Sequence, residues 1–456
     1  MKEKKKKTDH LLALIREGRP MTSGEQFRLT VALSVPAIVT QLSAIVMQYI
    51  DAAMVGSLGA NASASIGLVS TTTWLFWGLC AAASTGFSVQ VAHRIGADDW
   101  DCARSILRRS VPSTFAFSAL LAAIGVSVSG ALPQWLGGDS VIRSDASLYF
   151  LIFSLFLPIR IPSIAGVLLC ILDVGFNFFL IFPSRELSAG GLTLSIPGAG
   201  LGVQGAALGT GLAESVAAAI TLWYLFTRSS GLKIKAWRKS PSLPAPPIIR
   251  NSIRISLPMG LEHVVICGAQ IMTTVIVAPL GIPAIAANSF AITAESLCYM
   301  PGYGIADAAT TLVGQSLGAG RHRLTRRFAY ITVFMGMAVM GIMGVVMYIF
   351  APQIIGTMTP VEEIRRLGVM ALRIEAFAEP MFAAAIISYG VFVGAANTLV
   401  PSLMNFFSIW AVRISLAAWL APTMGLKGVW VAMCAELCFR GIIFLIRLRG
   451  KRWMKI

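Results

Sequence analysis

Charged residues are scarce in this sequence: Asp, Glu, Lys and Arg make up 13% of 456 positions, whereas 56% are hydrophobic. A soluble domain needs a largely polar exterior, and this composition excludes one. Uncharged runs such as 110–135 and 331–351 match or exceed the ~20 residues that cross a ~30 Å hydrocarbon core. The chain is therefore predicted to be an all-α polytopic membrane protein.

Metal-binding and disulfide-forming residues are also few. The four histidines and seven cysteines are scattered, and only Cys434 and Cys438 lie one helical turn apart. No histidine or second cysteine pair joins them, so we expect neither a metal site nor a disulfide framework.

Nucleotide-binding motifs are missing or out of context. No GxxxxGK[ST] loop occurs, and the GxGxxG run at 200–205 opens a small-residue helix with no Rossmann strand before it. We expect no cofactor and no enzyme activity. Transport by this chain would have to draw on an ion gradient, with H⁺ or Na⁺ as the coupling ion.

The net charge of +16 would suggest nucleic acid in a soluble protein. Here Lys and Arg concentrate in alternate loops, as they do in cytoplasmic loops of membrane proteins. We therefore expect no nucleic acid, both termini in the cytoplasm, and a location in the bacterial cytoplasmic membrane. The lysine run at 4–7 leads into 10–19, which is either a short helix on the inner leaflet or a frayed tail.

Twelve segments have the character of membrane helices. They cover 29–55, 63–92, 110–133, 146–158, 161–183, 202–227, 251–278, 284–314, 328–351, 367–394, 401–421 and 428–447. The fourth would rise only ~20 Å, which is short for a bilayer. The external stretch 186–196, with glycines at its centre, predicts a small β-hairpin.

A proline-rich run at 240–247 cannot continue a helix. It suggests five parts: a basic N-terminal segment 1–28, a first bundle 29–235, a linker 236–250, a second bundle 251–447 and a basic tail 448–456.

The two halves repeat one another. An offset of 222 in residue number aligns 34–104 with 256–326 without a gap and pairs Gly96 with Gly318. Each half has an even number of spans, so the repeats are parallel. That architecture favours a site between two bundles near the midplane and alternating access.

The repeat has a gap at the fourth helix and its loop. The offset is still 222 where Pro158 matches Pro380, but it is 239 where Pro162 matches Pro401. The two offsets differ by 17, and the first half lacks a stretch of that length. Three explanations stay open: the membrane thins there, neighbouring helices support the short one, or the protein is impaired.

Several motifs resemble one family. The run 36–59 (PAIVTQLSAIVMQYIDAAMVGSLG) and its second copy at 277–320 are similar to helices of MATE (multidrug and toxic compound extrusion) transporters. The run CILDVGFN at 170–177 resembles the fifth-helix motif of the branch named after DNA-damage-inducible protein F. The likeness covers roughly 25–447. It implies a twelve-helix, two-lobed, monomeric exporter of organic cations and amphipathic drugs, surrounded by lipid and driven by Na⁺ or H⁺.

Acidic residues inside predicted helices are the candidates for coupling, because a carboxylate in hydrocarbon must be paired, protonated or hydrated. Alternatively, each acid has a structural role, as a partner of Arg373, Arg413 or Arg440 or of backbone groups near a helix end. There are nine: Asp51, Asp173, Glu214, Glu262, Glu295, Asp307, Glu375, Glu379 and Glu436.

In the first half, Asp51 continues a helical stripe with Gln41 and Gln48 that should face the lobe interior. Burial favours the protonated acid, so Asp51 could exchange a proton for a cation; the alternative is a structural hydrogen bond. Asp173 and Asn177 lie one turn apart on one face of a later helix.

The resemblance implies that Asp51 and Asp173 form the cation site of the first lobe. The family often adds an Asn one turn before the second aspartate and a Thr on helix six. This chain has Leu169 at the former place and Thr210 at the latter. A proton needs fewer ligands than Na⁺, so this departure from the family pattern weakens the prediction of a Na⁺ site at Asp51 and Asp173.

In the second half, Glu262, Glu295 and Glu379 are candidates for coupling or for pairing with arginine. Glu375 and Glu379 share one face and should tend to hold one proton between them. Some family members place a cation-binding Glu one turn beyond Glu262, where this chain has Ile266. We favour structural roles for Glu214, Asp307 and Glu436.

Two other functions are consistent with the architecture. A flippase for lipid-linked oligosaccharide should have a cationic cavity, whereas these spans hold nine acids and three arginines. A non-transporting scaffold is conceivable because of the missing stretch.

Overall fold

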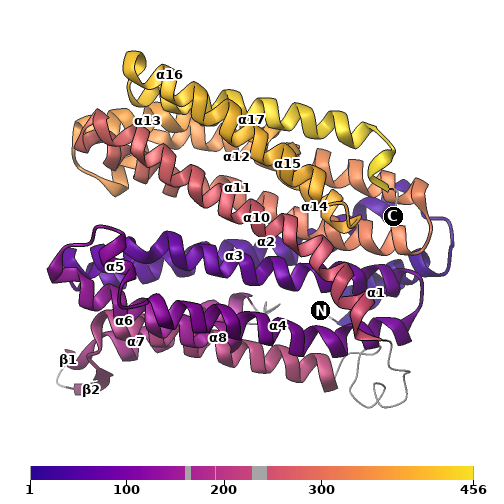
Figure 1. Cartoon of the computed structure of the whole chain (residues 1–456), viewed down its shortest axis with the longest axis horizontal. Coiled ribbons are helices and arrows are strands. Elements are labelled where there is room, and N and C mark those ends of the chain that lie inside the picture. The colour runs from indigo at the N-terminus through magenta and orange to yellow at the C-terminus, as the bar shows by residue number, and fades with distance from the viewer. Residues whose placement is uncertain (1, 160–165, 190–191, 228–243, 455–456) are drawn as a thin grey trace. The chain divides into compact units, whose positions relative to one another are not determined.

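The computed structural model describes residues 2–159, 166–189, 192–227 and 244–454. Long helices dominate, because only a helix satisfies every backbone polar group inside a bilayer. The helices of the first half are α1 (Lys2–Arg16), α2 (Ser23–Gly56), α3 (Ala60–Gly96), α4 (Trp100–Val128), α5 (Leu132–Trp135), α6 (Ser140–Phe156), α7 (Gly166–Ile181) and α8 (Gly202–Thr227). They are drawn in indigo to magenta in Figure 1.

The second half begins with α10 (Ala245–Val277). Its further helices are α11 (Ile282–Gly318), α12 (His322–Met358), α13 (Glu362–Glu375), α14 (Glu379–Gly394), α15 (Leu399–Phe407), α16 (Ser415–Met424) and α17 (Leu426–Arg449). A π-helical segment, Ser408–Ile414, joins α15 to α16. Single 3₁₀ turns occur at Leu157–Ile159, Ala278–Leu280 and Arg452–Met454.

Each of the twelve predicted segments is helical over most of its described length, but 367–394 is broken at 376–378, the helix in 110–133 ends at 128, and the one in 161–183 ends at 181. The start of 161–183 and most of the linker 236–250 lie outside the described residues. Nine described helices are long and apolar enough to cross a membrane, and α13 with α14 makes a tenth candidate bent by 60°. The chain is an all-α polytopic membrane protein, as predicted. The predicted hairpin is also present, as β1 (Pro183–Ala189) paired antiparallel with β2 (Leu192–Ala199).

The chain forms two compact units that do not follow the halves of the sequence. One comprises Met1–Leu42, Thr85–Ala103 and Arg250–Ile456; the other comprises Ser43–Ser84 and Arg104–Ile249. The first unit therefore contains the beginning of α2 and the end of α3 together with the second half of the chain.

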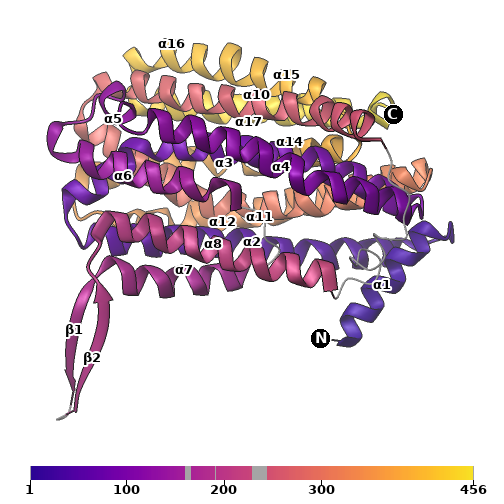
Figure 2. The same ribbon diagram turned by 60° about the horizontal axis from the view of Figure 1, so that its bottom comes forward.

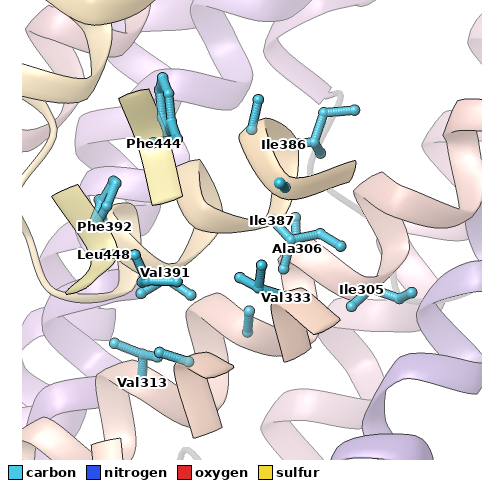
Figure 3. Packing of buried hydrophobic residues seen from close by; sticks show 14 of the residues in the cluster. Ile305, Ala306, Val313, Val333, Ile386, Ile387, Val391, Phe392, Phe444 and Leu448 are labelled. Carbon is cyan, nitrogen blue, oxygen red and sulfur yellow. The ribbon is translucent and has the colours of Figure 1, made fainter. Parts of the chain in front are cut away.

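The core of the first unit surrounds α14. Figure 3 shows its side chains Ile386, Ile387, Val391 and Phe392 among residues of α11, α12 and α17. In the other unit, a separate cluster joins Phe76 of α3, Leu121 of α4 and Phe150 of α6. The Phe76 and Phe150 rings meet edge to face at 5.6 Å.

The N-terminal stretch is helical from Lys2 to Arg16. Leu11, Leu14 and Ile15 are buried against Leu29 and Phe328 within the first unit. Arg321 donates from Nη1 to the carbonyl oxygen of Leu14 at 2.9 Å. The apolar face of α1 thus packs on protein, and of the two interpretations left open, a frayed tail does not hold for residues 10–16.

The gap in the repeat has a simple structural form. The residues that precede α6 and α13 as N-caps, Asp139 and Val361, are related by the offset of 222, so the two helices start in register. Helix α6 ends at Phe156, which corresponds to the bend before α14. The first half therefore has a counterpart of α13 and, within the described residues, none of α14.

Candidate functional site

Three side chains from α2 and α7 form a polar cluster in the smaller unit. Asp173 and Asn177 lie one turn apart on α7, and both are fully buried. Asn177 donates from Nδ2 to Oδ1 of Asp51 at 2.8 Å and to Oδ2 of Asp173 at 3.0 Å. One amide group thus joins two carboxyl groups from helices that are far apart in the sequence.

The two carboxyl groups also contact each other. Two ionised carboxylates this close repel strongly, so a proton or a bound cation between them is the favourable state. Asn177 Oδ1 is buried against Gly209 and accepts no hydrogen bond from the described residues. The arrangement can take up and release one positive charge.

Gly209 of α8 makes room for this cluster. A Cβ atom at this position would overlap Oδ1 of Asn177 and crowd its backbone nitrogen. The small-residue start of α8, which superficially matches a nucleotide-binding motif, instead allows α7 and α8 to approach closely.

Two residues predicted to join this cluster do not. Gln48 is exposed and Thr210 is half-buried, and the hydrogen bond that Asp51 accepts within the described chain comes from Asn177. Gln41, the first member of the predicted stripe, donates from Nε2 to Oδ2 of Asp307 at 3.1 Å in the other unit. The three residues of the stripe therefore do not share one set of contacts: Gln41 contacts Asp307, whereas Asp51 contacts Asn177.

Glu262 of α10 has its own buried set of donors. Ser402 donates from Oγ to Oε2 at 2.7 Å, and Asn405 donates from Nδ2 to Oε1 at 2.5 Å. The Tyr389 hydroxyl also contacts this carboxyl group. Sequence reasoning missed these partners because they lie on later helices far away in the sequence; the only local signal was the one-turn spacing of Ser402 and Asn405 on α15.

Glu295, Glu375 and Glu379 form an acidic group where α11 meets the bend between α13 and α14. All three are buried, and each of the other two acts electrostatically on Glu375. Neither oxygen of Glu375 has a hydrogen-bond partner among the described residues. Burial without donors is costly for a charged carboxylate, so this group favours protonated acids.

Glu436 is paired, as expected for a structural acid. It accepts from Nε and Nη2 of Arg413 at 2.9 and 2.6 Å, and Arg440 Nε lies 2.9 Å from Oε1. Ser408 donates to the same carboxylate at 2.5 Å. The third arginine of the predicted spans, Arg373, is exposed and lies over the Tyr348 ring at 5.3 Å.

No group of three or more His, Cys, Asp or Glu side chains in the described parts of the chain is arranged to hold a metal ion. The cluster at Asp51 and Asp173 supplies only two carboxyl groups.

Comparisons with known proteins agree with this architecture. The family model described as MatE matches residues 36–172 and 258–419. The probable multidrug resistance protein NorM of Thermotoga maritima is 24% identical over 449 residues, covering 93% of this chain and 92% of its own. The corresponding protein of Idiomarina loihiensis is 25% identical, with 93% and 94% covered.

Solved structures show the same fold. An outward-facing multidrug resistance MATE family transporter superimposes with a TM-score of 0.82 at 19% identity, covering 93% of this chain and 95% of that one. The Vibrio cholerae MATE transporter VcmN in its bent form gives 0.75 at 16% identity, with 99% and 100% covered.

Proposed function

Because this chain belongs to the MATE family of transporters, we propose that it exports small organic cations and amphipathic drugs in exchange for H⁺ or Na⁺. The observation that carries this proposal is the cluster of Asp51, Asp173 and Asn177, which can hold one positive charge inside an apolar bundle. The relatives named as multidrug resistance proteins support the substrate class.

Exchange follows from the electrostatics of the cluster. With a coupling ion bound, one of the two negative charges is neutralised and the carboxyl groups no longer repel each other, so the site attracts a further cation only weakly. Without it, two buried negative charges favour binding of a cationic substrate or a new coupling ion. Competition for one negative site is enough to couple the two movements, and one charge crossing 100 mV contributes ~2.3 kcal/mol.

A proton fits the described ligands better than Na⁺. The amide hydrogens of Asn177 already point at both carboxyl groups, which leaves few oxygen atoms for a metal ion that prefers several. Further proton-carrying acids are proposed in the larger unit: Glu262 with its own donors, and Glu295 and Glu379 in the acidic group. A flippase would need free buried cations, whereas Arg413 and Arg440 are both ion-paired with Glu436.

We further propose that the protein works as a monomer in the bacterial cytoplasmic membrane with both termini in the cytoplasm. The basic ends of α3, α4, α11 and α12 would then face the cytoplasm, following the distribution of Lys and Arg.

The test is uptake of a fluorescent cation into proteoliposomes with an imposed pH or Na⁺ gradient. We expect a pH gradient to drive uptake and Asp51→Asn to abolish it while the protein stays folded. Asp139→Asn, which alters an exposed acid outside the cluster, is the matched control and should transport normally. Unchanged transport by Asp51→Asn, or equal transport with all gradients collapsed, would refute the proposal.

A further inference from the structure

Helix α11 is less apolar than the helix beside it. It is 37 residues long and contains two acids, yet it is not among the nine described helices that are apolar enough to cross a membrane, whereas α12 is. Figure 2 shows the two helices side by side. The exposed residues of α12 between 331 and 350 are Phe334, Ala338, Ile342, Val345, Val346, Tyr348, Ile349 and Phe350. That face of α12 is suited to lipid.

The exposed residues of α11 have a different character. From Cys298 to the end of the helix at Gly318, only Tyr303 and Asp307 are exposed. They lie one helical turn apart and therefore share a face. Asp307 lies ~16 Å before the end of the helix, which is about the depth of one leaflet. A carboxyl group at this depth is costly against hydrocarbon, so this face of α11 meets water or a polar ligand.

Asp307 is held in place from α2. Gln41 donates from Nε2 to its Oδ2 atom at 3.1 Å. One turn earlier on both helices, Gly304 lies against the backbone of Ile38, where an added Cβ atom would overlap the Ile38 nitrogen. The two helices therefore pass backbone to backbone, which brings Gln41 within reach. No lysine or arginine of the described chain pairs with Asp307. The contact with Gln41 thus orients the carboxylate without neutralising it.

Tyr303 is the exposed end of a row of three aromatic rings. Tyr299 meets the Tyr303 ring edge to face at 5.9 Å and the Phe382 ring of α14 in the same manner at 5.6 Å. Tyr303 remains 43% exposed, so the row fixes its ring without covering it. A fixed, accessible ring one turn from a carboxylate can stack on a flat organic ligand and attract its positive charge.

We propose that Tyr303, Asp307 and Gln41 form a binding site for a planar organic monocation. Asp307 pairs with the positive charge, Tyr303 stacks on the flat ring system, and Gln41 is a positioning residue for the carboxylate. The site lies in the larger unit and is separate from the carboxyl cluster of the smaller unit. It rests on the proposed function only for the class of substrate, and it gives Asp307 a binding role in place of the structural role expected from the sequence.

Two ligands of nearly equal shape test the role of the charge. N-methylacridinium is permanently charged, and acridine is uncharged in mildly alkaline buffer. Each is titrated with the purified full-length protein in detergent, without an ion gradient, and its fluorescence is followed. The unmodified protein should bind N-methylacridinium at least ~10-fold more tightly than acridine. Asp307→Asn should remove this preference by weakening only the charged ligand, and Asp307→Glu should keep most of it. Absence of the preference in the unmodified protein, or its persistence in Asp307→Asn, would overturn the proposal.

Matched variants separate binding from structure. Tyr303→Leu should weaken both ligands about threefold or more, because each loses a stacking partner. Tyr348→Leu should bind both normally: Tyr348 is 41% exposed and also meets a neighbouring ring edge to face, at 5.7 Å, but on the apolar face of α12. Gln41→Leu leaves the carboxylate and should keep the preference for the charged ligand. If it lost the preference as fully as Asp307→Asn, Asp307 would be only a link between α2 and α11, and the proposal would be overturned.

The binding assay uses no gradient, so its outcome is distinguishable from failure of the proposed function. Normal binding by Asp307→Asn, together with loss of gradient-driven uptake in Asp51→Asn, would refute this site and leave ion-coupled export standing. Loss of the preference in Asp307→Asn, together with uptake that ignores every gradient, would support the site and refute ion coupling.

Discussion

Gly96 and Gly318, which occupy equivalent places in the two repeats, make equivalent contacts. Gly96 at the end of α3 adjoins the backbone of Gln315, and Gly318 at the end of α11 adjoins the backbone of His93. His93 and Gln315 are themselves equivalent at the same offset of 222. The two contacts are thus related by the repeat and form one crossing of α3 and α11 with both backbones almost touching, which only glycine permits.

Substituting one of these glycines should destabilise the crossing. In Gly318→Ala the new methyl group would overlap the His93 carbonyl, so we expect a loss of about 1–3 kcal/mol and a lower thermal midpoint. Gly67→Ala in the interior of α3 is the control, because nothing lies near its added Cβ and alanine favours a helix. Identical midpoints for Gly318→Ala and the unmodified protein would contradict the close crossing.

Moving Asn177 without altering any acid should impair transport. In Gly209→Ala the added Cβ would displace the Asn177 amide from Asp51 and Asp173, so we expect gradient-driven uptake to fall at least ~10-fold, a cost of about 1.4 kcal/mol. Gly175→Ala on α7 introduces the same methyl group into open space and should transport normally. The measurement is dye uptake into proteoliposomes at matched protein content; equal rates for both variants would argue against the amide bridge.

Removing the charge of Glu436 should be far more damaging than removing a surface acid. Glu436→Gln leaves the buried Arg440 and the half-buried Arg413 without the carboxylate they pair with, and about 3–5 kcal/mol of stability should be lost. Glu362→Gln breaks an exposed ion pair with Arg365 and should change stability by at most about 1 kcal/mol. Unfolding followed by tryptophan fluorescence in detergent compares the two. Adding Arg413→Met to Glu436→Gln should restore part of the loss.

The helices were predictable because a long apolar segment inside a bilayer can satisfy its backbone hydrogen bonds only by forming an α-helix. The bend before α14 was also predictable: Pro380 sits in the first turn of α14, where a missing N–H costs nothing. Proline alone does not signal a break, however, since Pro36, Pro258 and Pro352 lie inside continuous helices.

The partners of the acids were harder to predict. Asp173 and Asn177 share a turn, so their contact follows from helical spacing, and the resemblance pointed to Asp51. The donors to Glu262 come from a helix much later in the chain, and no spacing on one helix indicates which faces meet. Gln48 lies exposed on α2. Helical periodicity predicts which residues share a face, but it does not predict what that face contacts.

Asp139 provides a pH-dependent test outside the membrane segments. Its carboxylate accepts from the backbone N–H of Val141, and this bond lowers the pKa of Asp139. A lowered folded-state pKa means that the cap stabilises α6 above the unfolded value of about 3.9 and that this contribution is lost as pH falls through the folded pKa. In Asp139→Asn the amide oxygen can accept the same hydrogen bond at the start of α6, but the side chain does not titrate. The thermal midpoint of the unmodified protein should therefore fall more between pH 5 and 3 (roughly that window) than that of the variant.

Restoring the missing segment should stabilise the protein. A variant with 381–400 in place of 159–161 would supply a counterpart of α14 to the half-buried Leu107, Val111, Leu222 and Phe226. Burying such side chains fully contributes up to about 1.5–3 kcal/mol each, so even partial packing should raise the thermal midpoint in detergent. A control insert of the same length, with the apolar residues of 381–400 replaced by serine, should lower it. A variant that is no more stable than the unmodified protein in detergent would show that α4 and α8 have adapted to the short α6 and need no packing partner.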